Sequence, residues 1–176
     1  MTHAVSVRPR SWALVVCSLI LIALSVRAAI YEFTEALEGV VSSDAWLAVG
    51  ASTLSAVVGL VFLAWAARLK PTVLSWLAAF GWGTGGALIF AGYGNTVIDS
   101  AVAASNLGDD AVDVVTSVVT GPLVEETGKG IGVLALILAA RKLLTRPAQG
   151  GVLGALVGLG FAWGEDVGYY VSALED

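Results

Sequence analysis

Charged residues are scarce in this chain of 176 residues, where Asp, Glu, Lys and Arg together make up 13% and hydrophobic residues 57%. The mean hydropathy of +0.87 lies far above the range of soluble globular proteins. Size excludes a soluble protein with an unusually large core, because a chain of this length leaves too much surface to be covered by so few charges. The composition therefore predicts an integral membrane protein.

Cysteine is rare, and long polar tracts are missing. Cys17 is the single cysteine and lies inside an apolar run, which excludes a disulfide framework. The sequence contains no soluble domain, long linker, low-complexity tract or convincing internal repeat. We therefore expect one integral membrane domain over residues 1–176, in contact with the lipid bilayer and without a nucleic-acid partner.

Apolar runs long enough to cross a hydrocarbon core of roughly 30 Å recur along the chain. They cover approximately residues 11–30, 45–67, 72–92, 114–140 and 149–171. The predicted fold is all-α, a polytopic bundle of about five transmembrane helices in the cell membrane.

Basic and acidic residues are segregated on opposite sides of these runs. Seven of the nine basic residues border the runs on one side, with no acidic residue among them: Arg8, Arg10, Arg68, Lys70, Arg141, Lys142 and Arg146. The loops on the other side carry acidic residues: Glu32, Glu35, Glu38, Asp44, Asp99, Asp109, Asp110 and Asp113. Arg27 is the only base at that border. The positive-inside rule therefore places the N-terminus in the cytoplasm and the end of the fifth run outside.

The first run has some features of a signal peptide. Two arginines precede an apolar stretch from Trp12 to Val26, and Val26-Arg27-Ala28 follows it. The stretch is long for the apolar region of a signal peptide, and further runs follow. We therefore favour an uncleaved membrane anchor.

Two glutamates and a lysine interrupt the fourth run. Lys129 follows Glu125 by four residues and Glu126 by three, so it can reach one of them on the same helix face. A charge at bilayer depth costs a few kcal/mol, and such residues usually face the interior of a bundle or a cavity. A purely structural interpretation has the lysine neutralise one buried glutamate. It leaves the second carboxylate unexplained, which favours a functional site.

Pro122 allows two starting points for the helix that carries these glutamates. If the helix begins at Pro122, both glutamates lie near its first turn, where the helix dipole favours carboxylates. If it begins near Val114, Pro122 kinks a longer helix and the glutamates lie deeper. Both alternatives place them in the outer half of the membrane.

Glu165 and Asp166 interrupt the fifth run near its outer end. This run is antiparallel to the fourth, so at about 1.5 Å per residue Glu165 can reach the depth of the Glu125–Glu126 pair. The simplest interpretation of Glu165 and Asp166 is a solvated helix end, and that of Phe161 is a core or lipid contact. Glycines form two small faces suited to close helix packing, at positions 150, 154 and 158 and at 160, 164 and 168.

The two runs together resemble a known family. The fourth contains Pro122-Leu-Val-Glu-Glu-Thr-Gly-Lys129, and the fifth contains Gly158-Leu-Gly-Phe-Ala-Trp-Gly-Glu-Asp-Val-Gly-Tyr169. They resemble the first two motifs of the PrsW family of intramembrane proteases and, more distantly, the CAAX-protease and bacteriocin-processing superfamily. Asp166 stands where the family more often has asparagine. The resemblance covers roughly Thr120 to Tyr170.

The resemblance implies hydrolysis of a peptide bond in a membrane-anchored protein, inside or at the edge of the membrane. One family member cleaves a single-span anti-sigma factor from the extracytoplasmic side. A carboxylate can serve as general base towards water, and the developing oxyanion needs a proton donor, a cation or a metal. The resemblance assigns catalysis and its support to six residues: Glu125, Glu126 and Glu165 as catalytic, and Lys129, Phe161 and Asp166 as supporting.

Histidine is where the chain departs from the family. The family site has a further helix with an important histidine, and the complete site is expected to hold a divalent metal such as zinc. The one histidine, His3, lies in the predicted cytoplasmic tail. Zinc is bound by His or Cys as well as carboxylates, so no complete metal site can be drawn. We expect the chain to be a segment of a longer reading frame rather than a complete pseudoprotease.

Two other classes of function remain as alternatives. A catalytically inactive membrane adaptor would fit the missing histidine. A small proton- or cation-coupled transporter also places carboxylates at membrane depth, among glycine-rich helices. Transport requires a polar path to the cytoplasmic face, whereas residues 131–140 and 151–160 offer no polar side chain. The protease is the favoured interpretation.

Overall fold

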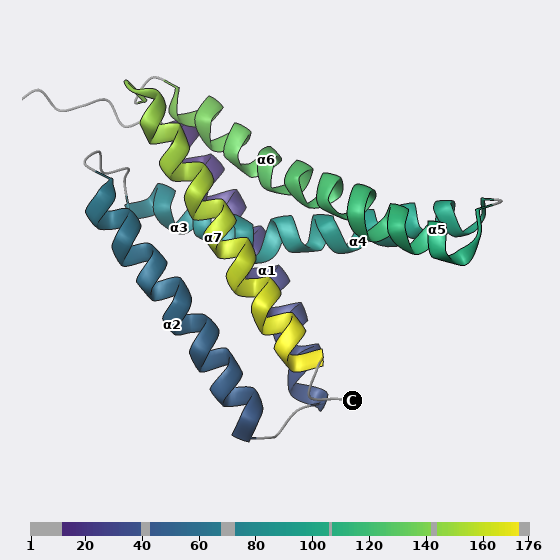
Figure 1. Cartoon of the computed structure of the whole chain (residues 1–176). Coiled ribbons are helices and arrows are strands. Elements are labelled where there is room, and N and C mark those ends of the chain that lie inside the picture. Colours follow the sequence, from purple (N-terminus) through teal and green to yellow (C-terminus); the bar gives the residue numbers. More distant parts are fainter. Residues whose placement is uncertain (1–11, 40–42, 68–72, 106, 142–143, 173–176) are drawn as a thin grey trace, which may run out of the picture.

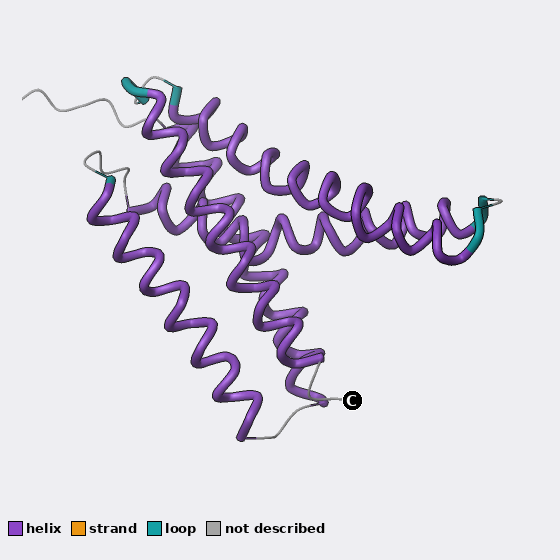
Figure 2. Tube along the Cα trace, in the orientation of Figure 1, coloured by secondary structure: helices purple, strands orange, loops and turns teal. Residues whose placement is uncertain are grey.

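The computed structural model describes residues 12–39, 43–67, 73–105, 107–141 and 144–172 (Figure 1). Within these ranges the chain is helical apart from short connecting segments, and no strand occurs there (Figure 2). The all-α helix bundle predicted from the sequence is confirmed. Each of the five predicted apolar runs falls on one of these ranges, except that residues 11 and 72 lie outside the described chain, and their boundaries as membrane spans stay predictions.

The first two helices are α1 (Trp12–Gly39) and α2 (Ser43–Ala66). By length and composition, two helical stretches of the described chain could cross a membrane: Val49–Ala66 in α2, and Val73–Ala103, which follows it. Trp12–Arg27 in α1 is apolar but shorter. A membrane setting is therefore supported by the helices as well as by the composition.

The stretch after α2 is one continuous helical rod with a wider turn in its middle. It consists of α3 (Val73–Gly81), the π-helical segment η1 (Trp82–Ala87) and α4 (Leu88–Ala103). We call it the α3–α4 rod. Segments of π-helix occur mostly as single wide turns inside α-helices, often at functional sites.

The α3–α4 rod extends beyond the predicted apolar run, which ended at residue 92. The hydroxyl groups of Thr96 and Ser100 donate hydrogen bonds to the carbonyl oxygens of Gly92 and Thr96, one turn back on the same helix. These bonds satisfy the polar side chains within the helix itself, and the helix continues beyond the predicted end of the apolar run.

The fourth range forms a second long rod, which contains the paired glutamates. It consists of α5 (Asp109–Val114), the π-helical segment η2 (Val115–Thr120) and α6 (Gly121–Ala140). Pro122 therefore lies inside a longer helix, the second alternative that the sequence allowed. Proline has no N–H to donate, and its ring crowds the carbonyl of the preceding turn. The wide turn just before it accommodates this misfit.

The last helix, α7 (Pro147–Ser172), packs against α2, α6, α3 and η1, while α1 covers α3 and η1 from another side. Figure 1 shows α2 and α7 running diagonally, with α4, α5 and α6 projecting to one side. The largest fully buried apolar side chains come from α6 and α7: Leu136, Leu153, Leu156 and Val157. The core therefore lies where these two helices meet the α3–α4 rod and α1.

Glycine allows α7 to approach the α3–α4 rod at backbone distance. A Cβ atom at Gly160 would collide with the carbonyl oxygen of Phe80, and one at Gly83 would collide with that of Val157. Of the glycine face predicted at 160, 164 and 168, the first two pack closely, whereas a Cβ at Gly168 would meet no atom within 4 Å. The other predicted face differs, because a Cβ at Gly154 or at Gly158 would meet no atom within 4 Å. Close approach of small residues is the usual way in which membrane helices associate.

Candidate active site

Lys129 connects the two glutamates of α6. Its Nζ atom donates a hydrogen bond to Oε1 of Glu126 at 2.8 Å and lies 3.9 Å from Oε2 of Glu125. The lysine and Glu125 side chains are 19% and 26% exposed, whereas that of Glu126 is 72% exposed. The helical spacing predicted a pair with one glutamate. The structure pairs Lys129 closely with Glu126 and brings Glu125 within ion-pair range.

Lys129 also connects α6 with α7. Its Nζ lies 3.9 Å from the centre of the Phe161 ring, which is 2% exposed. An ammonium group over an aromatic face is attracted by the ring quadrupole, and the attraction grows when both groups are shielded from water. Phe161 is therefore a core residue that also contacts the charged cluster.

Glu165 joins the cluster from α7. Its carboxylate is half-buried and interacts electrostatically with Glu125 and Lys129 of α6. Tyr169, one turn further along α7, forms a side-chain hydrogen bond with Glu165. Asp166 is exposed, as expected for a helix end. The two motifs thus meet at Lys129, which is ion-paired with Glu125 and Glu126 of α6, while Glu165 of α7 interacts with it electrostatically from the neighbouring helix.

Two members of this neighbourhood were not predicted from the sequence. Tyr169 stood inside the second motif, and its position one turn after Glu165 could have suggested the hydrogen bond. For Trp82, no feature of the sequence indicated a contact with this neighbourhood. Its indole Nε1 donates a hydrogen bond to the carbonyl oxygen of Gly128, at 3.0 Å, across 46 residues of sequence.

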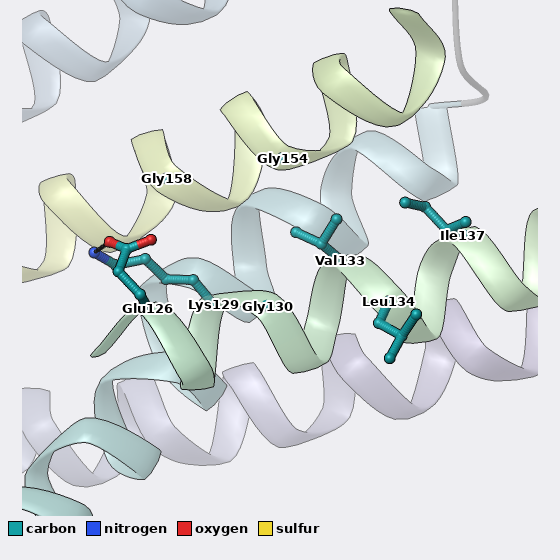
Figure 3. Close-up of a pocket in the computed structure, with 8 residues that line it drawn as sticks. All are labelled: Glu126, Lys129, Gly130, Val133, Leu134, Ile137, Gly154 and Gly158. Carbon is teal, nitrogen blue, oxygen red and sulfur yellow. Dashed lines mark hydrogen bonds and ion pairs between the residues drawn. The ribbon is translucent and has the colours of Figure 1, made fainter. Parts of the chain in front are cut away.

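A groove of about 440 Å³ runs between α6 and α7 from the charged pair (Figure 3). Glu126 and Lys129 lie at one end of the groove and Ile137 at the other. Its α7 side is formed by Gly154 and Gly158, the glycine face that no protein atom fills. The groove therefore gives an apolar approach to a charged end.

The fold and the charged cluster together define the class of this protein, an integral membrane protein with a polar site between two of its helices. The family model described as PrsW family intramembrane metalloprotease matches residues 71–176, which is more than half of the chain and includes both motifs. The chain belongs to this family, and it is thus an intramembrane protease by family. No curated protein and no solved structure matches it significantly.

The family description implies a metal, but the described residues do not fit one. They contain no group of three or more His, Cys, Asp and Glu side chains that could hold a metal ion. The donors of the cluster are carboxylates alone, whereas zinc is usually bound with His or Cys as well. His3 lies outside the described residues. The proposed chemistry therefore uses the side chains of the cluster only.

Proposed function

We propose that this protein hydrolyses a peptide bond of a membrane-anchored protein near the extracytoplasmic face, with a single-span anti-sigma factor as one substrate of this kind. The observation that supports this most is the meeting of the two motifs through Lys129, which contacts Glu126 on α6 and Phe161 on α7. A structural ion pair within α6 would not require a half-buried carboxylate on the neighbouring helix. Glu165 is such a carboxylate.

Glu125 is the stronger candidate for the general base. It is half-buried and interacts with Glu165 across the helix interface, whereas Glu126 is mostly exposed and occupied by Lys129. A base must lie within reach of a water that attacks the substrate carbonyl. Glu165 would position that water from the α7 side, and Asp166 would support this end of the helix.

Lys129 supplies the single positive charge of the cluster. We assign it to orienting the glutamates and stabilising the oxyanion that develops when water adds to the peptide carbonyl. Preorganised charges at such a position are usually the largest contribution to catalysis. One ammonium group cannot neutralise three carboxylates, so the cluster retains negative charge for proton transfer.

The proposed orientation follows from the charge segregation of the sequence. Two basic residues of the predicted cytoplasmic side lie in the described part of the α6–α7 connection, Arg141 and Arg146. The others lie outside the described residues: Arg8, Arg10, Arg68, Lys70 and Lys142. A cytoplasmic α6–α7 connection puts Glu125 and Glu165 in the outer half of a multi-pass protein of the cell membrane. The groove beyond Lys129 is lined by glycine and aliphatic residues, which does not favour a proton or cation path.

Mapping the cleavage position tests this proposal. The full-length protein is reconstituted into liposomes with a single-span membrane protein, and the products are identified by mass spectrometry. We expect the new termini to lie in the outer half of the substrate's span or just beyond it. Termini in the cytoplasmic half, or no cleavage by the wild-type protein, would contradict the proposal.

A further inference from the structure

Trp82, the first residue of η1, lies where the α3–α4 rod contacts α6. Its side chain is 8% exposed, and its indole Nε1 donates a hydrogen bond of 3.0 Å to the carbonyl oxygen of Gly128. The ring also covers Gly132, one turn further along α6, where a Cβ atom would collide with the indole. Trp82 therefore holds one turn of α6 through a directional bond and a close packing contact.

That turn of α6 directly follows the two glutamates. Gly128 is the residue before Lys129, and in a helix the position of one backbone carbonyl fixes the direction of the neighbouring side chain. Lys129 makes its contacts with Glu126 and with the Phe161 ring from this position. A rotation or axial shift of α6 relative to α7 would break the contact with Phe161.

The next residue of η1 contacts the other motif helix. Gly83 lies against the backbone of α7, where a Cβ atom would collide with the carbonyl oxygen of Val157 and the amide nitrogen of Phe161. Trp82 and Gly83 thus touch α6 beside Lys129 and α7 at Phe161. Neighbouring residues of the wide turn therefore hold the two motif helices.

We propose that Trp82 is a positioning residue of the proposed active site, and this inference rests on the proposed function. Its indole hydrogen bond sets the rotation and axial position of α6 relative to α7. In that position Lys129 lies over the Phe161 ring, and Glu125 and Glu165 interact electrostatically across the helix interface. Trp82 touches none of the reacting groups and acts through Gly128.

Trp82→Phe removes the indole N–H and leaves an aromatic ring. Trp82→His also replaces the indole by a smaller ring, close in size to that of phenylalanine, but its Nε2–H is two bonds from Cγ, as the indole N–H is in tryptophan. The matched control is Trp163→Phe, which removes the hydrogen bond of 3.2 Å from the Trp163 indole to the Thr53 hydroxyl, between α7 and α2. All three variants are made in the full-length protein.

The first readout is independent of activity. Glu125→Cys and Glu165→Cys are combined with Cys17→Ser, which removes the only native cysteine. A short bifunctional thiol reagent then crosslinks the two positions in membranes. We expect efficient crosslinking with Trp82 present, a clear loss of yield with Trp82→Phe, partial recovery with Trp82→His and no change with Trp163→Phe.

The second readout is kinetic. A misplacement of about 1 Å can cost up to roughly a hundredfold in rate, so Trp82→Phe should lower kcat about tenfold to a hundredfold and leave KM unchanged. Equal crosslinking and kcat in Trp82→Phe and wild type would overturn the inference, as would equal losses in Trp163→Phe or no recovery in Trp82→His. If no variant of a glutamate affects cleavage, the proposed function fails instead, and the crosslinking yield still decides the role of Trp82.

Discussion

Glu125→Gln should lower the rate of substrate cleavage by about 10²–10⁴-fold, the usual contribution of a general base. Glutamine keeps the size and the hydrogen-bonding capacity of the side chain but cannot accept the proton of the attacking water. Glu125 is half-buried and interacts with both Lys129 and Glu165. The neighbouring Glu126 is mostly exposed, so it should not replace Glu125 as the base. The rate is measured by single-turnover cleavage of a single-span substrate in liposomes.

The control for this substitution is Asp110→Asn. Asp110 is exposed in the first turn of α5 and belongs to neither motif. This change should alter the cleavage rate only slightly. Cleavage by Glu125→Gln at the wild-type rate would remove Glu125 from the catalytic residues, and an equal loss in Asp110→Asn would indicate a general effect of charge.

Gly160→Ala should give the largest loss of stability among single-methyl changes in α7. The added Cβ would collide with the backbone carbonyl oxygen of Phe80, which cannot rotate away as a side chain does. Overpacking usually costs about 1–3 kcal/mol and occasionally more, and a backbone collision belongs at the upper end of that range. The thermal midpoint in detergent and the yield of folded protein from membranes both report this loss.

Gly158→Ala is the matched control two residues earlier on the same helix. Its Cβ would meet no atom within 4 Å, and alanine is favoured over glycine in a helix by up to about 1 kcal/mol. We therefore expect an unchanged or slightly raised thermal midpoint. Similar midpoints for the alanine variants at 158 and 160 would mean that α7 packs on the α3–α4 rod through a different face.

The charged residues of the candidate site stand out in the sequence because the rest of it is so apolar. Glu125, Glu126 and Lys129 interrupt an apolar run at helical spacing, and a charge in such a run needs a polar surrounding. The same reasoning identified Glu165 on the antiparallel run. Its proximity to Glu125 could be predicted because the spacing of residues along two antiparallel helices places both side chains at a similar depth in the membrane.

The contacts between the helices could not be predicted in the same way. Whether Phe161 faces Lys129 or the lipid depends on the rotation of α7 about its axis, and that rotation is set by backbone contacts at Gly83 and Gly160. The hydrogen bond from Trp82 to Gly128 depends on the wide turn of η1. No local pattern distinguishes such a turn from ordinary α-helix.

The α3–α4 rod is longer than the apolar run predicted from the sequence. That run ended at residue 92, whereas the helix continues to Ala103, with the hydroxyl groups of Thr96 and Ser100 bonded to the carbonyls of Gly92 and Thr96. At Pro122 the sequence left two alternatives, because it does not show whether a wide turn precedes the proline. The π-helical segment η2 precedes it, so the helix does not begin there.

The most direct measurement of the central claim is a double-mutant cycle of cleavage rates with Glu125→Gln and Glu165→Gln. Groups on α6 and α7 that act as one catalytic unit lose nearly all activity when either is removed, so the second change adds little to the first. We predict that the double variant cleaves no more slowly, within a few-fold, than the slower single variant. Losses that multiply, or a Glu165→Gln variant with wild-type activity, would show that the two carboxylates do not form one site.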